Sequence, residues 1–114
     1  MKLTIKRDQA AKTGFFGGHK GMRFSLYARV KISADEQELI DKYKVNEHVL
    51  TYRDTENGQI PGLRIQDLVQ GHTTEIDDVG TLLNNEDVIK SACQDFKNLL
   101  LVMASFGGEE VIEI

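Results

Sequence analysis

The most regular alternation in this chain is Arg23-Phe24-Ser25-Leu26-Tyr27-Ala28-Arg29-Val30-Lys31-Ile32. Every even-numbered position is apolar, and every odd-numbered position is charged or polar, Tyr27 included. Successive side chains of a β-strand point to opposite faces of the sheet. The pattern therefore predicts a strand over residues 23–32 with one buried face and one solvated face.

The segment before it alternates in the same way. Leu3 and Ile5 fall on one side of residues 2–7, while Lys2, Thr4 and Lys6 fall on the other. Residues 14–21, which contain four glycines, separate the two patterns. We expect a hairpin built around this glycine-rich loop. If the two strands pair, one surface carries five cations: Lys2, Lys6, Arg23, Arg29 and Lys31. Their mutual repulsion calls for an acidic neighbour, either the chain's own Asp35, Glu36 and Glu38 or a ligand.

The residues that follow predict a short helix and further strands. Ser33 and Glu36 fit a capping box at the start of a helix of about three turns. Residues 48–53 and 63–69 are expected to be strands, with a turn at Asn57-Gly58 between them. Residues 73–76 predict a fifth strand or a loop, and residues 111–114 a short final strand.

A longer helix is expected over residues 85–106. Asp77–Gly80 predicts a turn, Asn84 or Asn85 is a suitable N-cap, and Gly107 is a suitable C-terminal stop. At 100° per residue one apolar arc forms. It consists of Val88, Ile89, Ala92, Cys93, Phe96, Leu99, Leu100 and Met103.

These elements predict a single α+β domain over residues 1–114. The expected order is β-β-α-β-β-α-β, with an antiparallel or mixed sheet of four to six strands packed on the long C-terminal helix plus one short helix. A chain of 114 residues with 40% apolar and 28% charged residues is typical of a globular domain. The longest apolar run, Leu99–Ala104, is far below the ~20 residues of a membrane-spanning helix. With Cys93 as the only cysteine and no signal-peptide pattern, we expect a cytoplasmic protein that does not enter a membrane.

Charge is distributed unevenly. The first 31 residues contain eight Lys/Arg and one acidic residue, although the whole chain has a net charge of −4. In the glycine-rich loop, Phe15 and Phe16 are candidates for stacking on bases, and His19, Lys20 and Arg23 for contacting phosphates. The alternative is a hairpin loop whose phenylalanines pack on the sheet or on a neighbouring subunit. Neither the P-loop pattern nor the dinucleotide-binding glycine pattern is present.

No catalytic, metal or cofactor site is expected. His19, His48 and His72 lack metal-ligand spacing, and each acidic pair has a structural explanation in a turn or at a helix end. Cys93 is expected to pack in the core as a small apolar residue.

Leu101 falls on the polar side of the C-terminal helix, which favours a contact with a partner or a second copy. We therefore expect a non-catalytic protein-interaction or regulatory domain that acts through a protein partner or as a homo-oligomer. The alternative is a nucleic-acid-binding module that uses the basic hairpin. The candidate partner- or ligand-binding residues are Phe15, Phe16, His19, Lys20, Arg23, Arg29 and Leu101.

Overall fold

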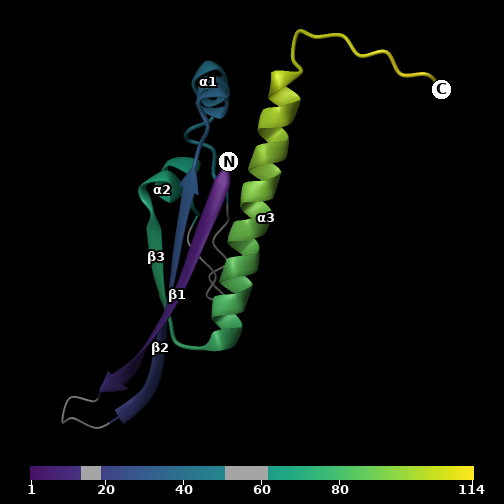
Figure 1. Cartoon of the computed structure of the whole chain (residues 1–114). Coiled ribbons are helices and arrows are strands. Elements are labelled where there is room, and N and C mark those ends of the chain that lie inside the picture. Colours follow the sequence, from purple (N-terminus) through teal and green to yellow (C-terminus); the bar gives the residue numbers. More distant parts are fainter. Residues whose placement is uncertain (14–18, 51–61) are drawn as a thin grey trace.

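The computed structural model describes residues 1–13, 19–50 and 62–114. Its elements follow the order β1 (Lys2–Thr13), β2 (His19–Lys31), α1 (Ala34–Tyr43), α2 (Ile65–Gln70), β3 (His72–Ile76) and α3 (Val79–Ala104). The three strands form an antiparallel sheet in the order β1-β2-β3, and α3 packs across one face of it (Figure 1). The predicted α+β class and the long C-terminal helix are confirmed.

The register of the hairpin assigns each side chain to a face of the sheet. Leu3 is opposite Val30, and Ile5 is opposite Ala28, so the apolar halves of both strands share one face. On β3, Ile76 is opposite Phe24 and extends this face. Leu26, Ala28 and Val30 are buried because α3 covers them. The alternation of residues 23–32 therefore predicted both the strand and its buried side.

α3 presents to the sheet the apolar arc that the sequence predicts. Six of its eight members are buried, while Val88 and Leu99 are partly buried against them. Phe96, in the middle of the arc, is 2% exposed. The helix begins earlier than expected, however. Asp78 is the N-cap, and its carboxylate accepts a hydrogen bond from the backbone N–H of Thr81 at 2.7 Å.

The early start of α3 corrects three expectations about its first turns. The predicted turn at Asp77–Gly80 does not separate β3 from a later helix start, because Asp78 is the N-cap and Val79 is the first residue of α3. Asn84 and Asn85 do not cap it, and Asn85 is buried within it. Glu86 is likewise buried instead of lying in a solvated first turn. The apolar stripe begins at Leu82, but the polar residues 84–87 that follow it led to a predicted helix start that was too late.

The capping box at the start of α1 is confirmed. The Ser33 hydroxyl accepts a hydrogen bond from the Glu36 N–H at 3.2 Å, and the Glu36 carboxylate accepts one from the Ser33 N–H at 3.0 Å. α1 lies at the end of α3, where the rings of Tyr43 and Phe106 meet edge to face with centroids 5.6 Å apart.

Two predicted strands were wrong, and one has only partial support. Residues 63–69 were predicted as a strand, but Ile65–Gln70 form helix α2, which buries Ile65 and Leu68 three residues apart. Residues 111–114 form no strand and are exposed. In the segment 48–53, Val49 forms an isolated bridge with Arg64, while residues 51–53 lie outside the described part, as does the turn at Asn57-Gly58.

The segment predicted as a strand or a loop over residues 73–76 is a strand, β3. The described residues thus contain three strands in the order β-β-α-α-β-α, in place of the predicted four to six strands and β-β-α-β-β-α-β. No helix within this part of the chain is long and apolar enough to cross a membrane.

Candidate functional site

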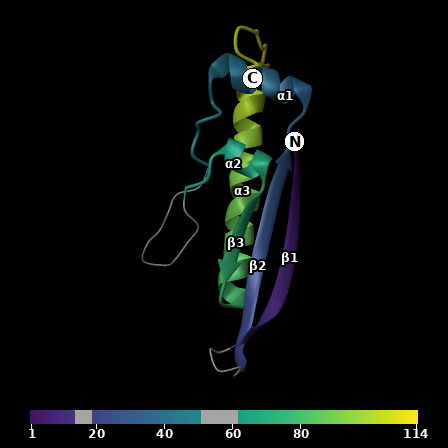
Figure 2. The same cartoon turned by 90° about the vertical axis from the view of Figure 1, so that its left-hand side faces the viewer.

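The face of the sheet opposite α3 carries the polar halves of the strands. We call it the outer face, and it consists of the even-numbered residues of β1 up to residue 10 and the odd-numbered residues of β2 and β3. Figure 2 shows the three strands from this side, with α3 behind them. The pairing places five cations on it, as the sequence predicts: Lys2, Lys6, Arg23, Arg29 and Lys31.

At one end of the outer face, two of these cations have local partners. Arg23 forms an ion pair with Glu75 of β3 at 3.2 Å. The ammonium of Lys6 lies over the ring of Tyr27, 5.6 Å from its centroid. Both contacts are exposed, and such contacts contribute only about 0.2–1 kcal/mol each. These residues therefore have a structural explanation that requires no ligand.

At the other end, three cations lie together, and none of them has an acidic partner among the described residues. Lys2 is directly opposite Lys31, and Arg29 is two residues along the same face. No carboxylate of the described residues forms an ion pair with any of the three. Like charges placed opposite each other on neighbouring strands destabilise the pairing. We call Lys2, Arg29 and Lys31 the cationic corner.

Glu36, one of the three acids predicted to neutralise these cations, has other partners. Glu36 binds the N-terminal ammonium of Met1 at 2.6 Å and caps α1 at the same time. Partial burial would raise the pKa of Glu36, but hydrogen bonds from the N-terminal ammonium and from Ser33 outweigh it and lower the pKa. Of the three acids expected to neutralise the basic surface, Glu36 thus serves the helix cap and the chain terminus. Asp35 and Glu38 form no ion pair with the described residues.

A pocket of about 510 Å³ opens beside the cationic corner. Its polar lining includes Thr4, Arg29, Lys31 and Gln37, and its apolar lining includes Ile32 and Val69. Four elements, β1, β2, α1 and α2, meet here. The site can therefore offer two positive charges, hydrogen-bonding groups and an apolar wall to one ligand.

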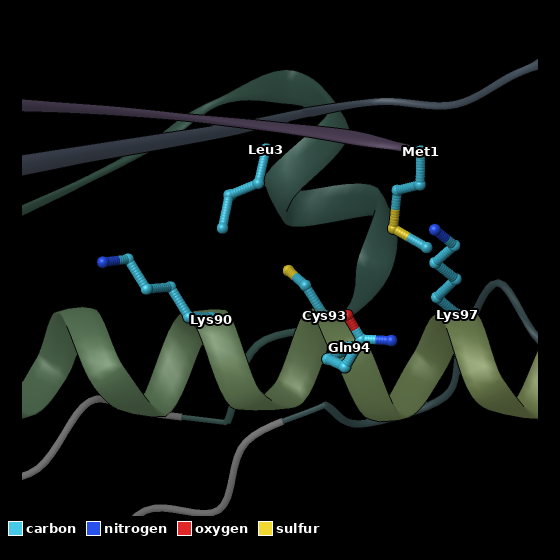
Figure 3. Close-up of a pocket in the computed structure, with 6 residues that line it drawn as sticks. All are labelled: Met1, Leu3, Lys90, Cys93, Gln94 and Lys97. Carbon is cyan, nitrogen blue, oxygen red and sulfur yellow. The ribbon is translucent and has the colours of Figure 1, made fainter.

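A second pocket, of about 200 Å³, lies on the other side of the sheet between β1 and α3. Figure 3 shows Cys93 below Leu3 and Met1, with Lys90 and Lys97 on either side. Burial raises the pKa of the Cys93 thiol to about 11. The thiol is therefore protonated at neutral pH and is a poor nucleophile, despite the two nearby lysines.

The structure places only some of the predicted site residues together. Arg23 and Arg29 share the outer face, but they lie at its opposite ends. Leu101 is 62% exposed on α3, which lies on the other side of the sheet, so it does not join them. His19 and Lys20 belong to β2 by their backbone, and Phe15 and Phe16 lie outside the described residues.

Some members of the site were not singled out from the sequence. Gln37 and Val69 line the pocket from two helices, one of which was predicted as a strand. Glu75 joins the outer face because β3 pairs with β2. A further contact, the ion pair between Arg7 and the buried Glu86, crosses from β1 to α3 on the inner side. Arg7 lies two residues after Ile5 and four after Leu3, so the alternation of β1 places it on the same face as these apolar residues. This spacing could have predicted that Arg7 faces the core.

Within the described ranges, no three His, Cys, Asp or Glu side chains gather closely enough to hold a metal ion. Comparison with protein-family models, with curated proteins and with solved structures found no match to this chain. The chemistry of the outer face is therefore the basis for the functional argument.

Proposed function

We propose that this protein is a non-catalytic interaction domain whose cationic corner binds an acidic surface of a partner protein. The observation that carries the proposal is the direct opposition of Lys2 and Lys31 next to Arg29 without an acid from the described part of the chain. An arrangement that costs stability in the free protein is expected to be relieved when carboxylates bind.

The composition of the adjacent pocket favours a protein over a nucleic acid as the partner. Protein interfaces combine charged groups with apolar contacts, and here Arg29 and Lys31 adjoin Ile32 and Val69. Single-stranded nucleic acid would instead require exposed aromatic rings on which bases stack. Over residues 2–10, 23–31 and 72–76, the outer face has one aromatic ring, Tyr27, which is partly buried and lies under the Lys6 ammonium. Phe15 and Phe16, the predicted stacking residues, lie outside the described residues.

Binding of two defined probes tests this proposal. We would measure the fluorescence anisotropy of a labelled decaglutamate peptide and of a ten-base-pair DNA duplex at 50 and 200 mM NaCl. Exposed charge pairs contribute about 0.2–1 kcal/mol each, so Arg29→Ala/Lys31→Ala should weaken peptide binding about 2- to 30-fold. The matched control, Lys90→Ala/Lys97→Ala, removes two lysines from the opposite side and should leave the affinity unchanged.

The outcomes separate the two classes of partner. Two results would contradict the proposal: an equal loss of peptide affinity in both double variants, or no peptide binding by the wild type at 50 mM NaCl. If the duplex binds and the peptide does not, and Arg29→Ala/Lys31→Ala lowers the salt slope by about two, the site binds nucleic acid instead. We further propose that the protein acts as a regulator in the cytoplasm.

A further inference from the structure

The segment after α3 is exposed and unusually apolar. Val111, Ile112 and Ile114 are 84%, 68% and 118% exposed. Among the described residues, no hydrogen bond, ion pair or ring contact involves residues 109–114. Figure 1 shows this segment extending away from the rest of the molecule. Clustered large aliphatic side chains in water usually indicate an interaction site.

β1 provides an open edge that such a segment can join. It is twelve residues long, and among the described strands it pairs with β2 alone, on one side. The backbone N–H and C=O groups on its other side are therefore available to a further strand. The 200 Å³ pocket between Met1, Leu3 and Cys93 lies below the same strand (Figure 3).

In one antiparallel register, residues 109–114 place opposite charges on the outer face of β1 and apolar side chains on its inner face. With Lys2 opposite Glu113, Lys6 falls opposite Glu109, because both pairs are four residues apart. On the inner face the same register places Ile112 opposite Leu3 and Ile114 opposite Met1, both of which line the pocket. The pocket has a volume of about 200 Å³ and is lined by Met1, Leu3 and Cys93 on its apolar part, so it has room for an aliphatic side chain. Lys90, Gln94 and Lys97 form its polar part.

Other registers fit less well. A shift by one residue turns every side chain of the added strand to the opposite face. A parallel strand that keeps the two charge pairs places Glu110 opposite Leu3. In the antiparallel register Glu110 lies opposite Ile5, one step along the inner face from the cation Arg7.

The segment cannot reach β1 of its own chain in this register. Figure 3 shows Met1 beside Lys97, and α3 continues for seven residues, about 10 Å, beyond Lys97. Lys6 lies about 16 Å from Met1 in the opposite direction along β1. Glu109 would have to span roughly 27 Å from Ala104, but five residues cover at most about 18 Å.

We infer that residues 109–114 pair as an antiparallel strand with β1 of a second copy of this chain. Gly107, with a φ of 83°, redirects the chain after Phe106, which is held at Tyr43 of α1. Reciprocal exchange between two copies closes a dimer, and one-way exchange extends to longer assemblies. Lys2 belongs to the cationic corner and also takes part in this pairing. Arg29 and Lys31 take no part in the added strand, so variants at these two positions test the partner site separately.

Sedimentation velocity at 10 and 100 μM tests the exchange. The wild type should associate, and a chain that stops after Gly108 should be monomeric with an unchanged circular dichroism spectrum. The control Leu101→Lys removes another exposed apolar side chain, on α3, and should associate like the wild type. A monomeric wild type at 100 μM would overturn the inference, as would a truncated chain that still associates.

Charge reversal tests the register without deletion. Lys2→Glu/Lys6→Glu and Glu109→Lys/Glu113→Lys each place like charges opposite each other, and each should weaken association. The variant with all four substitutions again has opposite charges at both positions, so it should associate like the wild type. Failure of the fourfold variant to recover association, with its fold intact, would refute this pairing. Arg29→Ala/Lys31→Ala should leave association unchanged, so the two proposals can fail independently.

Discussion

At the scale of single residues, Phe96 contributes most plainly to stability. It lies in the middle of the apolar arc of α3, is 2% exposed, and has the ring of His48 6.1 Å away. We predict that Phe96→Ala lowers the free energy of unfolding by about 3–5 kcal/mol, because a buried aromatic ring is replaced by a cavity. Urea denaturation measures the change. A midpoint close to that of the wild type would show that Phe96 is not central to the core.

Arg7 neutralises a carboxylate that would otherwise be buried alone. The side chain of Glu86 is 4% exposed, while that of Arg7 is 54% exposed. Breaking a fully buried pair costs about 3–5 kcal/mol, and we expect about 2–3 kcal/mol for Arg7→Ala because water reaches the arginine. Arg7→Leu/Glu86→Leu should recover most of that loss in urea denaturation. If the double variant is less stable than Arg7→Ala, the pair is not the cause.

Cys93 gives a pH-dependent prediction. Its pKa is raised by burial from 9.0 to about 11, so the folded state favours the protonated thiol. The resulting stabilisation is complete below pH 9 and is lost as the pH rises through 11. The difference in free energy of unfolding between wild type and Cys93→Ala should therefore shrink between pH 9 and 11. A constant difference across this range would show that the thiol is not protected.

At the scale of elements, local patterns predicted what local interactions determine. The alternation over residues 23–32 and the Ser33–Glu36 capping box each depend on neighbours in sequence, and both were confirmed. Residues 63–69 were misassigned because the alternation of Leu63, Arg64 and Ile65 fits a strand, while the spacing of Ile65 and Leu68 fits a helix. The start of α2 depends on Asp67, whose carboxylate accepts a hydrogen bond from the Arg64 N–H at 2.9 Å.

The N-terminus of α3 offers a test at the same scale. Hydrogen bonds from the backbone and hydroxyl of Thr81 lower the pKa of Asp78 from its usual 3.8, so the capping carboxylate is ionised at neutral pH. Its stabilisation is present above that value and is lost as the pH falls through the lowered pKa. Asp78→Ala should reduce the melting temperature at pH 7 and have a smaller effect at pH 2.5. An equal effect at both values would exclude the charged cap.

At the scale of the whole molecule, the sequence predicted one surface of the site but not its surroundings. Strand parity alone predicted that Lys2, Arg29 and Lys31 share a face, and the register confirms it. Glu75 and Val69 reach that face through the pairing of β3 with β2 and the packing of α2 beside it. Such contacts join residues far apart in sequence, and no local pattern encodes them.

We expect the cationic corner, and not the opposite side of the molecule, to be the binding surface. A titration of ¹⁵N-labelled protein with decaglutamate, followed by amide chemical shifts, tests it most directly. We predict that the largest shifts occur at Thr4, Arg29 and Lys31 and at neighbouring residues of α2, while the amide shifts of Lys90 and Lys97 of α3 remain unchanged. Shifts concentrated on α3, or spread evenly over all lysines and arginines, would contradict it.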